Sequence, residues 1–211
     1  MKTAALVPLK RLALSKRRLR DVLPQSAVEE LGQCMLSDVL QALRESSVAA
    51  IYTLTEDPAV ARIARDAGSR VRLEQPDPGL NPAIDAAERE LSEAGFEASL
   101  VVLGDLPLLV PADIEAVLTA GREHAVVIAP ATDGGTAMLW RRPPGALPSC
   151  FGPDSAERHA RAALEAGRRA HCLTTIDALT RTDLDTLEDA RRVRDSSHPC
   201  RTRALLQRIL P

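Results

Sequence analysis

The chain has 211 residues, of which 45% are hydrophobic and 27% charged, and its formal net charge is −2. This composition is that of one ordinary globular domain, long enough to bury a sizeable core. Only four residues are aromatic, which argues against a module that stacks single-stranded bases on aromatic side chains, so no nucleic-acid partner is expected.

The charge is distributed unevenly along the chain. Residues 1–20 contain seven lysines and arginines and no acid, so the remaining residues sum to −9. A basic start on an acidic body indicates one localised anion site. A transit peptide would also be rich in arginine and free of acids. Against that alternative, Thr3–Val7 has the pattern of a short buried strand, and Pro8 would break a presequence helix.

The cysteines and the apolar runs bear on the compartment. The four cysteines are widely spaced and match no zinc or redox motif: Cys34, Cys150, Cys172 and Cys200. Without a secretory signal, reduced thiols in the cytoplasm are the expectation. No apolar run approaches the roughly 18 residues of a membrane-spanning helix, so no membrane partner is expected.

Short apolar runs alternate with longer helical patterns along the chain. Runs typical of strands occur five times: Thr3–Val7, Val48–Leu54, Arg70–Leu73, Ser99–Leu103 and Ala125–Pro130. Helical patterns lie between and after them: a helix that begins at Ser26, Asp57–Ala67, a helix that begins at Asn81, Pro111–Gly121 and Ser155–Gly167. This alternation predicts an α/β fold with a mostly parallel sheet and helices on both faces, a Rossmann-like three-layer sandwich.

Local signals refine two helix starts. Ser26 followed by Glu29 has capping-box spacing, and the next positions keep an apolar stripe at helical periodicity: Val28, Leu31, Met35, Val39 and Leu43. Asn81 followed by Pro82 predicts a capping residue and a proline at the first helical position.

No internal repeat or linker divides the chain. The stretch Arg141–Pro148 is rich in arginine and proline and is expected to be a loop. Ser196–Pro199 is expected to end the ordered body. We therefore predict one domain over residues 1–195 and a tail over 196–211 that contains a short helix.

Spaced cations follow the first predicted strand, and ligands of such sheets bind where strands end. After Pro8 the chain carries Lys10, Lys16 and Arg18. Cations spaced in this way can line a triphosphate, with Arg bonding two oxygens and Lys acting as a point charge. A solvated basic face is the alternative. The segment has neither a glycine-rich cradle nor a Walker A motif, which excludes a P-loop enzyme.

An isolated carboxylate follows the predicted strand Ser99–Leu103. Asp105 stands between Gly104 and Leu106-Pro107. A carboxylate at the carboxyl edge of a sheet suits Mg²⁺, which prefers oxygen ligands and shares them with substrate phosphates. A turn or cap is the alternative, because Asp favours both.

A second acidic segment lies near the end of the domain. Asp183 and Asp185 alternate, so an extended backbone would direct both to one face. Thr186 and Asp189 have capping-box spacing and predict the start of a further helix.

Three stretches offer backbone groups to a ligand. Gly79-Leu80-Asn81 opens a helix, where backbone can approach a nucleotide and Asn offers a donor and an acceptor; simple capping is the alternative. Asp133-Gly134-Gly135 before Thr136 has the composition of a hairpin turn. Gly152 precedes Ser155 at a helix start, which is either a cap or a docking place for a small carboxylate or phosphate.

Taken in order, these blocks resemble the 2-phospholactate/phosphoenolpyruvate guanylyltransferases of coenzyme F-420 biosynthesis. The resemblance extends from Leu6 to about Asp189. Arg17 departs from the family's Lys-Ser-Arg-Leu block, where serine is usual, and Ala137 departs from its Gly-Thr-Asn triplet.

The resemblance implies a fold of the nucleotide-diphospho-sugar transferase type and a reaction. GMP would pass from GTP to a three-carbon phosphorylated acid, and pyrophosphate would leave. The implied catalytic residues are Lys16, Asp105 and Asp183, with Mg²⁺ held by the two carboxylates. The implied nucleotide contacts are Pro8, Lys10, Lys16, Arg18, Gly79 and Asn81. The implied acceptor contacts are Thr136, Gly152 and Ser155.

Several alternatives stay open at this point. The acceptor is phosphoenolpyruvate, 2-phospholactate or 3-phosphoglycerate. The sequence does not decide how strictly GTP is selected or whether the protein forms a homodimer. The second metal ligand is Asp183 or Asp185. A molybdopterin cytidylyltransferase has the same fold, but its glycine-rich start is missing here. A non-catalytic nucleotide-binding protein would have no use for paired carboxylates. His159, alone on an amphipathic helix, is expected to be a packing or capping residue.

Overall fold

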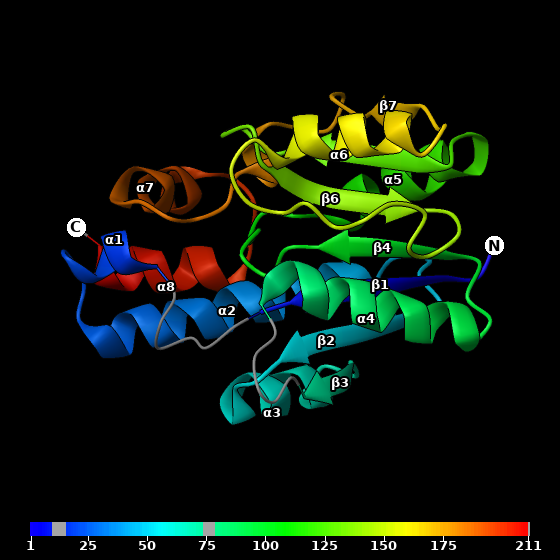
Figure 1. The fold of residues 1–211 in the computed structure, drawn as a ribbon. Helices are drawn as coiled ribbons and strands as arrows, with labels where there is room; N and C mark the ends of the chain where they lie inside the picture. The colour runs from blue at the N-terminus through cyan, green and yellow to red at the C-terminus, as the bar shows by residue number, and fades with distance from the viewer. Residues whose placement is uncertain (10–15, 74–78, 211) are drawn as a thin grey trace.

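The computed structural model describes residues 1–9, 16–73 and 79–210, which form a three-layer α/β sandwich (Figure 1). Its strands make one sheet in the order β3-β2-β1-β4-β6-β5-β7. The strands are β1 Thr3–Pro8, β2 Ala50–Thr55, β3 Arg70–Leu73, β4 Ala98–Val102, β5 Val126–Pro130, β6 Thr136–Arg141 and β7 Ala170–Cys172. The helices are α1 Arg17–Arg20, α2 Gln25–Arg44, α3 Pro58–Asp66, α4 Leu80–Glu93, α5 Pro111–Glu123, α6 Ser155–Glu165, the 3-10 helix η2 Leu179–Arg181, α7 Leu187–Asp195 and α8 Arg201–Ile209.

The sheet is parallel except at β6. Strand β6 runs antiparallel to both β4 and β5, whereas the pairs β1–β2, β1–β4, β2–β3 and β5–β7 are parallel. Its first residue, Thr136, therefore lies at the edge of the sheet where β4 and β5 end. The expectation of a mostly parallel sheet is confirmed, and the five predicted strands are present with ends displaced by no more than two residues.

Two apolar layers enclose the sheet. One contains buried residues of α2, α3 and α5, such as Leu36, Val60 and Val117. The other contains residues of α4 and α6, such as Ile84 and Ala163. Side chains of a strand alternate between the two faces, and adjacent residues of β1 accordingly belong to different layers. Both faces of the central strands are thus buried, which explains their nearly continuous apolar sequences.

A third apolar cluster lies beyond the carboxyl ends of the central strands, where α1, α2, α7 and α8 meet (Figure 1). Leu205 and Leu206 of α8 are buried there together with Leu31 of α2. The Asp38 carboxylate of α2 accepts hydrogen bonds from the backbone N–H groups of Arg201 and Thr202, at 3.0 and 2.9 Å, and so caps α8. None of the described helices is long and apolar enough to cross a membrane.

Three predicted helix caps are corrected by the structure. Pro24, not Ser26, stands at the N-cap of α2, and no side chain caps that end. Gly79, not Asn81, is the N-cap of α4, with φ at 90°, a conformation that glycine adopts without strain. Asp154 precedes α6, so Ser155 is the first helical residue and not its cap. Each polar side chain lies one to two residues inside its helix, because the backbone enters helical geometry earlier than the capping signals indicated.

Two strands and one loop boundary also differ from expectation. Strand β6 is not among the five predicted strands, and it extends to Arg141, the first residue of the predicted loop. Strand β7 has three residues, too few for a periodic signal.

Trp140 of β6 is fully buried against α5, and a Cβ at Gly121 would stand 2.6 Å from its ring. Only glycine therefore fits at that crossing.

Candidate active site

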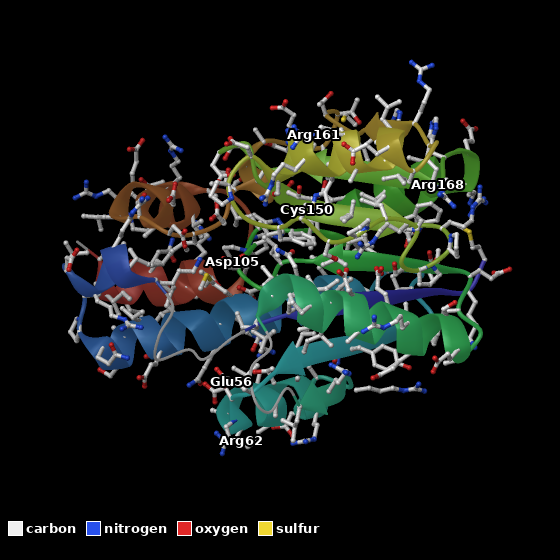
Figure 2. The ribbon with its side chains drawn as sticks, viewed as in Figure 1. Glu56, Arg62, Asp105, Cys150, Arg161 and Arg168 are labelled. Carbon is white, nitrogen blue, oxygen red and sulfur yellow. The ribbon has the colours of Figure 1, made fainter. Side chains whose placement is uncertain are left out.

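Asp105 follows β4 at the carboxyl edge of the sheet (Figure 2). Lys16 forms an ion pair with it there. The Lys16 ammonium donates to Asp105 Oδ2 at 2.6 Å and also to Asp185 Oδ1. Its side chain is 6% exposed. Burial alone would lower the pKa of Lys16, but the carboxylates of Asp105 and Asp185 outweigh it and raise that pKa above its ordinary value. The lysine is therefore a fixed positive charge.

The backbone at Lys16 is in the left-handed region, with φ 57° and ψ 47°. Non-glycine residues adopt this conformation rarely and at a cost in free energy, and such residues concentrate at functional sites. The conformation places Lys16 at the start of α1 with its ammonium on two carboxylates.

Asp183 completes a cluster of three carboxylates. Ligand oxygens of Asp105, Asp183 and Asp185 all lie within 4.8 Å of one another, and these residues are here called the carboxylate cluster. Burial, followed by repulsion from Asp105 and Asp185, raises the pKa of Asp183 to about 7. One ammonium does not balance three carboxylates. The excess negative charge of the cluster therefore favours binding of a further cation.

The segment that carries Asp183 and Asp185 is held on both sides. Leu184 between them is fully buried, and its N–H donates to the Asp105 carbonyl at 3.2 Å. Leu184 packs in the third apolar cluster, the one formed with α1, α2, α7 and α8. The side chains of its two neighbours, Asp183 and Asp185, therefore project away from that cluster. Arg181 is buried and donates to the carbonyls of Ile176 and Pro130, which ties the preceding turn to the end of β5.

The next helix starts as the sequence indicated. Thr186 and Asp189 form a capping box at the start of α7. The predicted cap is confirmed. The structure brings both Asp183 and Asp185 close to Asp105, so either carboxylate is within reach of a cation bound there. Residues distant in sequence thus converge because β4 and the turn before α7 end at the same edge.

The donor set suits a hard divalent cation. All three side chains offer carboxylate oxygens, the ligands that Mg²⁺ prefers. Asp105 Oδ1 is buried and has no hydrogen-bond partner among the described residues. A buried carboxylate oxygen without a partner is costly, and a bound cation would remove that cost.

Thr136, Ser155 and His159 form a second polar group at the same edge, here called the hydroxyl network. The Ser155 hydroxyl donates to Thr136 Oγ1 at 3.0 Å, and His159 Nδ1 lies 3.0 Å from the same oxygen. All three residues are buried. Burial, then the charges of Arg141 and Arg158, lower the pKa of His159 to about 4, so the ring is neutral at physiological pH.

The turn between β5 and β6 connects the two groups. Gly134 accepts a hydrogen bond from Ala156 N of α6 at 3.2 Å, and Thr132 bonds Thr182 through their hydroxyls at 3.2 Å. The Asp133 carboxylate adds to the raised pKa of Asp183. The predicted hairpin turn is confirmed, and it lies between the carboxylate cluster and the start of α6.

The remaining predicted site residues have different surroundings. Pro8 ends β1 and pairs with Leu54 of β2. Arg18 is exposed on α1. Gly79 opens α4, and the amide of Asn81 bonds both backbone groups of Phe151. Gly152 is exposed, with φ at 126°. Lys10 lies outside the described residues.

The structure also adds residues that sequence reasoning passed over. His159 is fully buried against Phe151, which agrees with the packing role expected of it, and its position four after Ser155 places the two on one helix face. Arg158 and Arg181 donate to loop carbonyls and carry no sequence signal beyond their charge. Asp185, one of the two candidates for the second metal ligand, belongs to the carboxylate cluster.

Comparison with known proteins identifies the family. The family described as "Guanylyl transferase CofC like" matches residues 3–207. The phosphoenolpyruvate guanylyltransferase of Rubrobacter xylanophilus is 39% identical over 198 residues, which cover 93% of this chain and 95% of the relative. That of Chloroflexus aggregans is 35% identical over 202 residues, covering 92% and 97%.

Solved structures share the fold. A Desulfovibrio desulfuricans G20 protein assigned as a nucleotide-diphospho-sugar transferase superposes with a TM-score of 0.81 at 18% identity, covering 99% of this chain and 95% of that chain. A Methanothermobacter nucleotidyl transferase superposes with a TM-score of 0.65 at 18% identity, covering 92% and 96%. The predicted fold class and family are thus confirmed. The chain belongs to the CofC-like guanylyl transferases, and the reaction of the family is guanylyl transfer.

Proposed function

We propose that the chain transfers GMP from GTP to phosphoenolpyruvate and releases pyrophosphate, as a step of coenzyme F-420 biosynthesis. Relatives that bear the name phosphoenolpyruvate guanylyltransferase align with more than nine-tenths of the chain, which supports this acceptor. The observation that carries the proposal is the carboxylate cluster with Lys16 at the carboxyl edge of the sheet. Such a site suits a nucleotide that is bound as its metal complex.

In this reaction the acceptor supplies its own nucleophile. A phosphate oxygen of phosphoenolpyruvate bonds to the α-phosphorus of GTP, the bond from that phosphorus to the bridging oxygen breaks, and pyrophosphate leaves with the electron pair. The attacking phosphate is already ionised at neutral pH, so no side chain has to remove a proton. The protein contributes by positioning the substrates and neutralising charge.

Asp105, Asp183 and Asp185 would hold Mg²⁺, which when bound neutralises phosphate charge and polarises the α-phosphorus. Lys16 would exchange its bonds to Asp105 and Asp185 for bonds to phosphate oxygens, where its fixed charge stabilises the departing pyrophosphate. Arg18, exposed beside Lys16 on α1, would meet the outer phosphates.

The acceptor would bind between the hydroxyl network and Gly152. This position is supported by the hairpin turn at Asp133–Gly135, which contacts the start of α6 and lies near Asp183. Gly79, at the start of α4, would approach the nucleotide with its backbone. We place the enzyme in the cytoplasm, whose reducing conditions fit four free thiols.

The test is pyrophosphate release measured for each of ATP, CTP, GTP and UTP with phosphoenolpyruvate, 2-phospholactate and 3-phosphoglycerate. We expect GTP with phosphoenolpyruvate and Mg²⁺ to give the highest kcat/KM, and EDTA to abolish turnover. Faster turnover with another acceptor would overturn the assignment of phosphoenolpyruvate. Faster turnover with CTP would instead favour a cytidylyltransferase of the same fold.

A further inference from the structure

The segment between β6 and α6, residues 142–154, contains no helix or strand. It crosses the face of the sheet between α4 and α6 (Figure 1). A segment without regular structure must still satisfy its buried backbone N–H and C=O groups. Side chains of the two flanking helices do so here, and they hold its last part from opposite sides.

Helix α4 holds the segment through three polar residues on one face, Asn81, Asp85 and Glu88, spaced at four and three positions. Asp85 Oδ1 accepts from Ser149 N at 3.0 Å, and Glu88 Oε2 accepts from Gly145 N at 2.6 Å. Asn81 makes two bonds to one residue: Phe151 N donates to its Oδ1 at 2.7 Å, and its Nδ2 donates to the Phe151 carbonyl at 3.1 Å. The Asn81 amide thereby pairs with both backbone groups of Phe151, as the backbone of a neighbouring strand would.

Helix α6 holds the segment from the other side, at Cys150 (Figure 2). His159 Nε2 accepts from Cys150 N at 2.9 Å. Arg158 donates to the carbonyls of Cys150 and Phe151. The N–H groups of Ser149 and Phe151 thus face α4, and that of Cys150 faces α6. This alternation is that of an extended chain with a partner on each side.

The bond from Cys150 fixes the state of the histidine ring. A backbone N–H can only donate, so His159 Nε2 is an acceptor and the ring proton of the neutral imidazole sits on Nδ1. Nδ1 therefore donates to Thr136 Oγ1, which also accepts from Ser155. His159 thus connects the backbone of the segment to the two hydroxyls of the predicted acceptor site.

We propose that Asn81 and His159 are positioning residues that hold residues 149–151 between α4 and α6 and so place Gly152 and the hydroxyl network for the acceptor. The inference rests on the proposed function only in locating the acceptor near Gly152. Gly152 follows Phe151 directly, and its φ of 126° suits glycine alone. Asn81 then acts on the acceptor through Phe151, and not on the nucleotide as the resemblance implied.

The experiment compares Asn81→Leu and His159→Leu with the conservative changes Asn81→Asp and His159→Gln. Asn81→Asp keeps an acceptor for Phe151 N–H, and His159→Gln keeps one for Cys150 N–H. We expect the two Leu variants to raise KM for the acceptor about tenfold, the size of one to two lost neutral hydrogen bonds. The conservative variants should recover part of that loss. The dissociation constant for GTP should change less than about twofold in all four.

Glu93→Leu is the matched control, because Glu93 is exposed on the same helix as Asn81. Thermal unfolding establishes that each variant is folded, and the conservative variants carry the test if a Leu variant is not. Hydrogen exchange supplies a readout that needs no turnover: the Phe151 amide should exchange faster in Asn81→Leu, and the Cys150 amide in His159→Leu.

Weaker GTP binding by Asn81→Leu with an unchanged acceptor KM would overturn the proposal and make Asn81 a nucleotide contact. Unchanged acceptor KM and unchanged exchange in folded variants would overturn it as well. If the parent protein turns over none of the three acid phosphates, the proposed function fails, and the exchange data alone decide whether Asn81 and His159 hold the segment.

Discussion

The carboxylate cluster and the hydroxyl network lie at the same edge of one sheet but differ in how they are stabilised. Three carboxylates share one ammonium, and Asp105 Oδ1 has no partner among the described residues. In the hydroxyl network the groups are neutral and bonded to one another. The carboxylate cluster therefore carries an excess of negative charge, whereas the polar atoms of the hydroxyl network already have hydrogen-bond partners.

The difference indicates what each region needs from its ligand. Like charges brought together without a counter-ion destabilise a protein. Such sites are kept because function requires them, although they lower the stability of the fold. The carboxylate cluster should therefore gain stability when a cation binds or when a charge is removed. The hydroxyl network gains nothing from a cation, and its integrity depends on His159 remaining neutral.

The largest effect is expected at Asp183. Asp183→Asn should lower kcat by on the order of 100-fold or more, because a group that organises transition-state charge is lost. In EDTA the same variant should be more stable than the parent, because removing one of three mutually repelling carboxylates relieves the burial and repulsion that raise the pKa of Asp183. Pyrophosphate release and urea unfolding measure the two effects. Asp195→Asn, an exposed change on α7, is the control, and full activity of Asp183→Asn would remove the carboxylate cluster from the reaction.

The hydroxyl network should respond to acid. Burial and the two arginines hold the pKa of His159 near 4, below its ordinary 6.5. The unfolded chain therefore binds a proton that the folded chain does not, so stability is full above pH 6.5 and decreases as the pH falls toward 4. Between pH 7 and 4.5 this contribution should amount to roughly 2 kcal/mol.

Urea unfolding of His159→Gln across that range checks the sign and size. Gln cannot titrate, so the variant should lose less stability than the parent on acidification. His198→Gln, outside the hydroxyl network, should follow the parent. Parallel pH profiles for the parent and His159→Gln would show that His159 does not carry the effect.

Ser155→Ala should separate the acceptor from the nucleotide. Losing one hydroxyl that bonds Thr136 is expected to raise KM for the acceptor about tenfold, while GTP binding stays unchanged. Acceptor kinetics and calorimetric titration of GTP give the two values. Ser92→Ala, exposed on α4, is the control. Equal weakening of both substrates would mean that their pockets are not distinct.

The smallest effect is expected at Arg18, which is exposed and screened by salt. Arg18→Ala should weaken GTP binding by about two- to fivefold at low ionic strength and by less in high salt. The exposed Arg62 of α3 lies well apart from Asp105, at the end of the sheet that carries β3 (Figure 2), so Arg62→Ala should leave binding unchanged. Identical binding by both variants would make the basic start a solvated face.

The sequence was sufficient for most of the framework because buried parallel strands have continuous apolar runs that end in recognisable turns. It failed where position depends on tertiary contacts. Ser26 and Asn81 have capping chemistry, yet the helices begin before them. Strand β7 is defined by its pairing with β5 and not by a pattern of its own.

In the candidate site, too, some features could be predicted from the sequence and others depend on long-range contacts. Asp105 could be singled out by its place at a strand end, and the Asp183–Asp185 alternation indicated one shared face. Their meeting with Lys16 depends on Leu184 being buried beside Asp105, which is a long-range contact. The buried position of His159 agrees with the sequence, but its partners, Cys150 N and Thr136 Oγ1, could not be predicted because they come from two other segments.

The fully buried indole of Trp140 gives the protein a fluorescent reporter of its own. It is the only tryptophan in the chain, and it belongs to the same strand as Thr136, with Gly121 packed against its ring. Emission from an indole shielded from water occurs at shorter wavelength than emission from a hydrated one. Unfolding of the sheet should therefore appear as a red shift from a single emitter, with no label and no added residue.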